Sequence, residues 1–301
     1  MKTLHKTAIA LAASSLFASG VFAQAAPAAE APEASPITAN VTVVNDYRYR
    51  GISQSNFKPA IQGGFDYAHE SGLYIGNWNS SISWISDAYG PNGGVSGNGL
   101  IAGQVSSSIE MDFYAGIKKE LIGEGFASDF GVLQYYYPTS GIPNTNGLTA
   151  NPNTTELYVA QNFTFGPVTG FAKVSYALTS LFGTVNSAGS YYPDLTVNYD
   201  TGIWGLALNG HVGYQYVAGN QSSAATVWNS GATIPGISNS TLYSYTDWKL
   251  GVTKDFGGGL SANVSYVGTN AATYLGSYAY SSPSGKNLGK AGGLISLTKT
   301  F

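Results

Sequence analysis

Residues 204–216 read WGLALNGHVGYQY, and two kinds of side chain alternate along this run. The even positions carry large apolar or aromatic side chains: Trp204, Leu206, Leu208, Val212, Tyr214 and Tyr216. The odd positions carry small or polar ones: Ala207, Asn209, His211, Gly213 and Gln215. Successive side chains of a β-strand point to opposite faces, so this period of two predicts a strand with one apolar and one polar face.

The same alternation recurs along the chain after residue 39. Twelve segments show it, and most can supply the ~9–11 residues with which a tilted strand crosses a membrane. They begin near Asn40, Ala60, Gly72, Ser107, Ala127, Thr154, Val168, Pro193, Ile203, Tyr243, Gly259 and Lys290. We extend the first strand from residue 41 to residue 50, and we find no clean apolar face in 130–137.

The connections between these segments separate a membrane barrel from a soluble β-sandwich, whose strands also alternate. Tight turns stand at 69–72, 166–167, 200–202 and 255–258. Long loops stand at 85–106, 138–153, 179–192, 217–242 and 269–289. The short loop 51–58 and the longer turn 118–125 are mild exceptions. Since outer-membrane barrels have short periplasmic turns and long outer loops, we predict an all-β, transmembrane, antiparallel up-and-down barrel of 12 strands, with both termini on the periplasmic side.

The first residues have the features of a secretory signal peptide. Lys2 and Lys6 precede an apolar stretch at 8–17, and Val21-Phe22-Ala23 has small residues at the two positions that a signal peptidase reads. A cut after Ala25 is the alternative, and the apolar stretch is too short for a comfortable membrane anchor. We therefore expect a signal peptide at 1–23, an Ala/Pro/Glu-rich periplasmic leader at 24–38 and an outer-membrane β-barrel at 39–301.

Composition narrows the function classes. Charged residues make up only 10% of the chain, there is no cysteine, and no basic run suggests nucleic acid as a partner. Cysteine chemistry is excluded, metal ligands do not cluster, and we expect no cofactor. Of the three histidines, His5 leaves with the signal peptide, His69 lies in a turn and His211 faces the lumen, so we expect no enzyme.

The charged side chains on the strands are the candidate site residues. A Lys or Arg on the lipid face costs roughly 2–4 kcal/mol at mid-membrane, so charges belong in the lumen. Alternation places there Asp46, Arg48, Arg50, Asp66, Glu110, Asp112, Glu156, Lys173, Asp247 and Lys249. They form either a charged constriction that selects solutes or a paired interior that only braces the barrel. Six acids against four bases predict a mild preference for cations.

Arg48 and Arg50 stand two residues apart on the predicted first strand, on the same face as Asp46. A turn near 51–58 would set Asp46 roughly opposite Gly64, with Asp66 one diagonal step away. We therefore expect guanidinium groups and carboxylates to share one sector of the barrel wall.

Aromatic residues and the last residue fit the same fold. We expect interfacial girdles of Tyr47, Tyr49, Tyr74, Trp78, Trp84, Tyr136, Tyr176, Tyr199, Trp204, Tyr216, Trp248 and Tyr266. A final aromatic on the last strand resembles the assembly signal of outer-membrane barrels, which makes Phe301 the candidate signal. Lys299 departs from that pattern, since its position is usually apolar.

Two runs near the start of the predicted barrel resemble a known family. They are Asn45-Asp46-Tyr47-Arg48-Tyr49-Arg50-Gly51-Ile52-Ser53-Gln54 and Pro59-Ala60-Ile61-Gln62-Gly63-Gly64-Phe65-Asp66-Tyr67. Further matches are Glu110-Met111-Asp112-Phe113-Tyr114-Ala115-Gly116, Tyr135-Tyr136-Tyr137-Pro138 and Thr155-Glu156-Leu157-Tyr158. Over essentially all of 39–301 the chain resembles the TorF-type porins of proteobacteria (the Gcw_chp family). The resemblance implies an outer-membrane channel and brings no defined substrate or catalytic residues.

We expect a channel for passive diffusion of small hydrophilic solutes in the outer membrane of a Gram-negative cell. Its partners would be outer-membrane lipid, small hydrophilic solutes and the barrel-assembly machinery, and its oligomeric state is left open. The alternative is a surface receptor or adhesin with a plugged barrel, whose loops 217–242 and 269–289 bind the partner.

Overall fold

The computed structural model describes residues 35–89, 106–139, 150–221, 236–274 and 276–301. The predicted signal peptide and most of the predicted leader lie outside the described residues. Strand β1 begins at Ile37, so the last two residues assigned to the leader belong to the barrel.

Twelve strands of the described chain form one closed antiparallel barrel, which confirms the predicted fold. The strands are β1 (Ile37–Val44), β4 (Ala60–Ala68), β5 (Leu73–Ser81), β6 (Ile109–Gly123), β7 (Phe126–Tyr136), β8 (Thr154–Phe165), β9 (Val168–Ala177), β10 (Tyr191–Asp200), β11 (Leu206–Gln215), β12 (Tyr245–Asp255), β13 (Leu260–Thr269) and β16 (Gly292–Thr300). Each pairs with the next, and β16 pairs with β1 to close the sheet. Every start lies within three residues of the predicted one.

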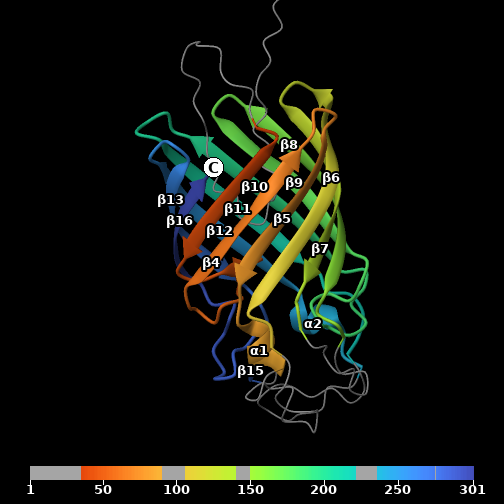
Figure 1. Cartoon of the computed structure of the whole chain (residues 1–301). Helices are drawn as coiled ribbons and strands as arrows, with labels where there is room; N and C mark the ends of the chain where they lie inside the picture. The colour runs from red at the N-terminus through yellow and green to blue at the C-terminus, as the bar shows by residue number, and fades with distance from the viewer. Residues whose placement is uncertain (1–34, 90–105, 140–149, 222–235, 275) are drawn as a thin grey trace, which may run out of the picture.

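The two ends of the barrel differ (Figure 1). The tight turns lie at one end, where the backbone N–H of Phe301 donates to the carbonyl of Ala39 at 2.8 Å. The opposite end carries the helices α1 (Trp84–Tyr89) and α2 (Asn239–Tyr243) and the small hairpin of β14 (Thr273–Tyr274) and β15 (Ser277–Tyr278). The longer turn predicted at 118–125 is wrong, because β6 continues to Gly123 through a register irregularity and pairs there with Phe126.

The barrel is apolar outside and polar inside, the reverse of a soluble protein. On β4, Ile61 is 59% exposed on the outer face, whereas its neighbour Gln62 is 3% exposed inside. The same holds around the barrel for the outward residues Phe65, Ile75, Phe113, Phe130, Leu157, Val159, Val174, Leu208, Leu250, Val264, Ile295 and Leu297. An apolar surface that surrounds a β-barrel is the surface that lipid covers.

The prediction that the first strand reaches residue 50 is wrong. β1 ends at Val44, which pairs with Ala60 of β4. Between them, residues 45–59 fold into the lumen as a segment that we call the docked loop. It contains a short hairpin of β2 (Arg48–Tyr49) and β3 (Ile52–Ser53). Asp46, Arg48 and Arg50 therefore belong to the docked loop and not to the barrel wall.

The register between β1 and β4 also corrects the predicted neighbours of Asp46. Gly64 lies opposite Asn40, and Asp66 lies opposite Thr38 near the turn end of the barrel. Asp66 accepts a hydrogen bond from Tyr114, at 2.5 Å, and has no part in the sector around the arginines.

The docked loop divides the lumen into two halves. Aromatic side chains fill one of them. Buried residues of this cluster include Tyr47, Tyr49, Tyr74, Trp78, Tyr114, Leu133, Tyr135 and Tyr137. The girdle prediction is therefore wrong for Tyr47, Tyr49, Tyr74 and Trp78, which pack inside. Tyr136, Tyr176, Tyr199, Trp204 and Tyr266 are instead 42–81% exposed. Leu133 and Tyr135 contribute to this inner packing, which explains why 130–137 shows no clean face.

Candidate functional site

The tip of the docked loop turns at Arg50 and Gly51, with φ angles of 45° and 78°. Two consecutive positive φ angles between paired strands are those of a type I′ hairpin turn. A Cβ on Gly51 would lie 2.5 Å from Thr269 Cγ2 and 2.9 Å from Asp247 Cβ, on strands β13 and β12. Glycine thus allows both the turn and the close approach of the tip to the far wall.

Arg50 fixes the tip to the barrel. Its Nη2 donates to both carboxylate oxygens of Glu156, at 2.7 and 3.0 Å, and its Nη1 donates to Gln215 Oε1 at 2.6 Å. The guanidinium also lies 4.2 Å from the ring centroid of Tyr192. Burial disfavours the charge, but the attraction of Glu156 outweighs it and raises the pKa of Arg50. The group is a permanent cation with its own counter-ion.

Arg48 braces the docked loop from within. Its Nε donates to Asp46 Oδ2 at 2.5 Å, and its Nη1 donates to the carbonyls of Gly51, Leu288 and Lys290 at 2.9–3.1 Å. Because Leu288 and Lys290 directly precede β16, this arginine ties the loop to the last strand as well as to itself.

Carboxylates of β6 face the aromatic side of the docked loop. Glu110 accepts hydrogen bonds from Tyr47 and, at 2.6 Å, from Tyr137. Burial, with the nearby Glu110 carboxylate, raises the pKa of the Tyr47 phenol, so it stays a donor. Asp112 is 1% exposed, and neither carboxylate oxygen has a hydrogen-bond partner among the described residues.

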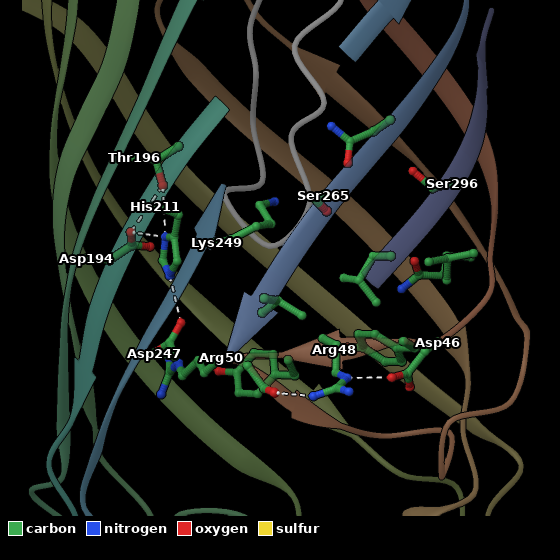
Figure 2. A pocket seen from close by; sticks show the side chains of 18 of the residues that line it. Asp46, Arg48, Arg50, Asp194, Thr196, His211, Asp247, Lys249, Ser265 and Ser296 are labelled. Carbon is green, nitrogen blue, oxygen red and sulfur yellow. Dashed lines mark hydrogen bonds and ion pairs between the residues drawn. The ribbon is translucent and has the colours of Figure 1, made fainter. Parts of the chain in front are cut away.

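The other half of the lumen holds a cavity of about 130 Å³ beside the docked loop (Figure 2). Strands β9 to β12 contribute its charged wall, and β13, β16, β1 and β4 contribute a neutral polar wall. The neutral wall consists of Asn263, Ser265, Ser296, Thr298, Thr42 and Gln62.

His211 lies between two carboxylates on the charged wall. Its Nδ1 lies 3.0 Å from Asp194 Oδ1, and its Nε2 lies 2.8 Å from Asp247 Oδ1. Thr196 and Tyr192 add contacts at 3.1 Å, and Tyr192 donates to Asp247 at 2.8 Å. Ionised carboxylates only accept hydrogen bonds, so both ring nitrogens carry protons and the ring is an imidazolium.

Two lysines complete this wall. Lys173 on β9 lies opposite Asp194, and Lys249 on β12 lies opposite His211 in the strand ladder. The Lys173 ammonium also lies 6.0 Å from the ring centroid of Tyr158. Lys249 forms no hydrogen bond or ion pair among the described residues, and Figure 2 shows its side chain directed toward the middle of the cavity.

The structure brings some of the predicted site residues together and separates others. Asp46, Arg48, Arg50, Lys173, Asp247 and Lys249 line the cavity. Glu110 and Asp112 lie on the aromatic side, Glu156 binds Arg50, and Asp66 lies apart. Whether these charges select solutes stays a prediction. Phe301 is 72% exposed at the end of the chain, and its role in assembly also stays a prediction.

Sequence reasoning missed Asp194, Tyr192 and Thr196 as partners of His211. The signal was available, because these residues alternate along 191–200 with the outward Tyr191, Leu195 and Tyr199. Within the part of the chain that the structure describes, no group of His, Asp and Glu side chains could hold a metal ion. No helix in that part is long and apolar enough to cross a membrane.

Comparison with solved structures finds β-barrels of low sequence identity. The KdgM porin is 6% identical, with a TM-score of 0.46 over 88% of this chain and 98% of the porin. LpxR from Salmonella typhimurium is 10% identical, with a TM-score of 0.42 over 88% of this chain and 99% of its own. The outer membrane protein OpdK from Pseudomonas aeruginosa is 11% identical, with a TM-score of 0.39 over 81% of this chain and 58% of its own.

No curated protein matches the sequence. A family model, described as a bacterial protein of unknown function, matches residues 28–239 and 234–301, which include the docked loop and all twelve barrel strands. The chain therefore belongs to the Gcw_chp family.

Proposed function

We propose that the protein is a porin-like channel through which small hydrophilic solutes diffuse passively. One observation carries the proposal: a closed barrel with an apolar outer surface encloses a polar cavity lined by charged, hydroxyl and amide side chains. Such a lining replaces part of the hydration shell of a polar solute that passes through it.

In this proposal the docked loop sets the width of the passage. It enters from the end that carries the long loops and reaches β8, β11 and β12 with its tip. The segment 45–54, which resembles the TorF-type porins, forms most of this loop. We therefore propose that the residues that carry the resemblance serve to narrow the lumen. The passage follows the cavity, because aromatic side chains occupy the other half.

We place the channel in the outer membrane of a Gram-negative, proteobacterial cell, after cleavage of a signal peptide and insertion by the barrel-assembly machinery. The apolar outer face supports contact with lipid, and short turns at one end with long loops at the other support the orientation.

We propose no enzymatic activity. His211 is the one histidine of the described lumen, and two carboxylates hold both of its nitrogens. A doubly protonated ring cannot accept a proton from a hydroxyl, so it lacks the property that a general base requires. The imidazolium serves as a fixed cation that holds Asp194 and Asp247.

Planar bilayers with the purified, folded protein test the channel. Stepwise conductance, together with swelling of proteoliposomes in small sugars, is the expected result. Absence of both would refute the channel and favour a plugged barrel that acts through its outer loops.

A further inference from the structure

The charges in the lumen separate into two groups. Glu110, Asp112 and Glu156 are 1–2% exposed and lie on the side of the aromatic cluster, where Glu156 binds Arg50. The cavity is lined by five basic side chains, namely Arg48, Arg50, Lys173, His211 and Lys249, and by three acids, namely Asp46, Asp194 and Asp247. With His211 as an imidazolium, the lining is net positive even when Glu156 is counted against Arg50.

Most cations of the cavity have a carboxylate partner. Asp46 neutralises Arg48, Glu156 neutralises Arg50, and His211 holds two acids. Lys249 differs, because it has no ion pair or hydrogen bond within the described chain. Its two acidic neighbours, Asp194 and Asp247, already bind the imidazolium.

The neutral wall across from Lys249 offers hydroxyl groups. Ser265 and Ser296 lie on β13 and β16, and neither hydroxyl has a hydrogen-bond partner among the described residues. Figure 2 shows both side chains on the side of the cavity toward which Lys249 points. A cation on one side and open hydroxyls on the other suit a small solute that carries an anionic group and hydroxyls.

We infer that the cavity binds the oxyanion group, carboxylate or phosphate, of small hydroxylated solutes, and that Lys249 is the cation that contacts it. A partly desolvated ammonium without a counter-ion is unfavourable, and an incoming anion supplies the missing partner. Lys173 lies on the same wall and adds positive potential. The inference rests on the proposed channel, gives it a substrate class, and reverses the mild cation preference that the count of six acids and four bases suggests.

Reversal potentials in a potassium chloride gradient test the selectivity. We expect the wild type to prefer chloride, and Lys249→Met to lower the chloride-to-potassium permeability ratio by about threefold or more. Lys249→Arg should restore the preference. Lys254→Met is the matched control, because Lys254 lies on the same strand and donates to the carbonyl of Trp204 outside the cavity. Lys249→Gln replaces the methionine variant if the latter does not fold.

Titration calorimetry of the folded barrel in detergent tests binding without a current. The probes are sodium succinate and sodium phosphate, with sorbitol as the neutral comparison. We expect saturable binding of at least one anion, weakened about tenfold by Lys249→Met and unchanged by Lys254→Met. The stronger anion identifies the oxyanion that the site prefers.

The two measurements separate the proposals. The anion site is refuted, and the channel is retained, if the conductance favours potassium and does not change in Lys249→Met. Absence of anion binding that depends on Lys249 refutes the site as well. Anion binding that depends on Lys249, in a protein that shows no conductance, supports the site and refutes the channel.

Discussion

Arg50 and Glu156 lie 106 residues apart in the chain, and a guanidinium nitrogen contacts both oxygens of the carboxylate at 2.7 and 3.0 Å inside the barrel. The contact joins the tip of the docked loop to β8. It is one of several contacts that hold the docked loop in the lumen, together with those of Arg48 and Tyr49.

Replacing Arg50 should release the loop without unfolding the barrel. Arg50→Gln leaves Glu156 without its cation, and removal of one partner of a buried pair costs about 3–5 kcal/mol. Since Arg50 is not on the barrel wall, we expect that cost to fall on docking. Single-channel conductance should rise, with the folded fraction nearly unchanged. The double variant Arg50→Gln/Glu156→Gln should recover part of the docking, and a large loss of heat resistance in Arg50→Gln alone would argue for a structural brace.

A methyl group at Gly51 should also release the docked loop, because it would collide with the barrel wall. In Gly51→Ala the new Cβ meets Thr269 and Asp247 at 2.5 and 2.9 Å, so the tip cannot reach the wall. Gly202→Ala is the control, since Gly202 also has a positive φ, of 68°, but open space around its Cβ position. We expect trypsin to cut after Arg50 in proteoliposomes only for Gly51→Ala. Equal cleavage of both variants would show that contact between the new Cβ and the barrel wall is not the cause of release.

The buried carboxylate of Asp112 should destabilise the protein. It is 1% exposed and lacks hydrogen-bond partners among the described residues, which is unfavourable for an ion. Asp112→Asn should therefore raise the temperature at which the heat-modifiable band converts on gels. Glu156→Gln should leave this temperature nearly unchanged, because the loss of the Arg50 partner is expected to weaken docking of the loop and not the barrel wall. A lower conversion temperature for Asp112→Asn would mean that the carboxylate has a stabilising role.

High pH should weaken docking of the loop. Burial raises the pKa of Tyr47, Tyr49 and Tyr137, so the docked state keeps these phenols protonated. In a released loop, Tyr47 and Tyr49 ionise near the ordinary value of about 10. The docked state is unaffected below that pH and loses stability relative to the released state above it. Conductance should rise between pH 9 and about 11 in the wild type and stay flat in Gly51→Ala, in which the loop is already free.

The terminal aromatic should matter for insertion. Phe301 is exposed, and its ring lies 5.4 Å from the Lys299 ammonium. Deletion of Phe301 should lower the membrane-inserted fraction and leave misassembled chain in the periplasm, as measured by cell fractionation. An unchanged fraction would show that the last residue is incidental.

Alternation was enough to predict the barrel because successive residues of a wall strand face lipid and lumen in turn. Asp112 and Lys249 were placed in the lumen by that rule alone. The rule failed at 45–50, where Asp46, Tyr47, Arg48 and Tyr49 also alternate. A hairpin folded into the lumen and a strand in the wall produce the same period of two, and only register against Ala60 separates them.

The division of the lumen could not be predicted for a related reason. Placement on the inner face does not say whether a charge meets water or aromatic side chains, because that depends on where the docked loop lies. The sequence analysis therefore assigned Asp112 and Lys249 the same role. In the structure Asp112 is buried on the aromatic side, whereas Lys249 lines the cavity.

Arg48 binds the carbonyls of Leu288 and Lys290, which are about 240 residues further along the chain. The docked loop is synthesised early, but Arg48 can form these two hydrogen bonds only after the segment before β16 has been synthesised and positioned. Until that segment is in place, the docked loop lacks these two contacts and is held by earlier strands, for example through Arg50 and Glu156. Docking of the loop therefore depends in part on closure of the barrel, because Arg48 needs carbonyl groups that lie next to the last strand.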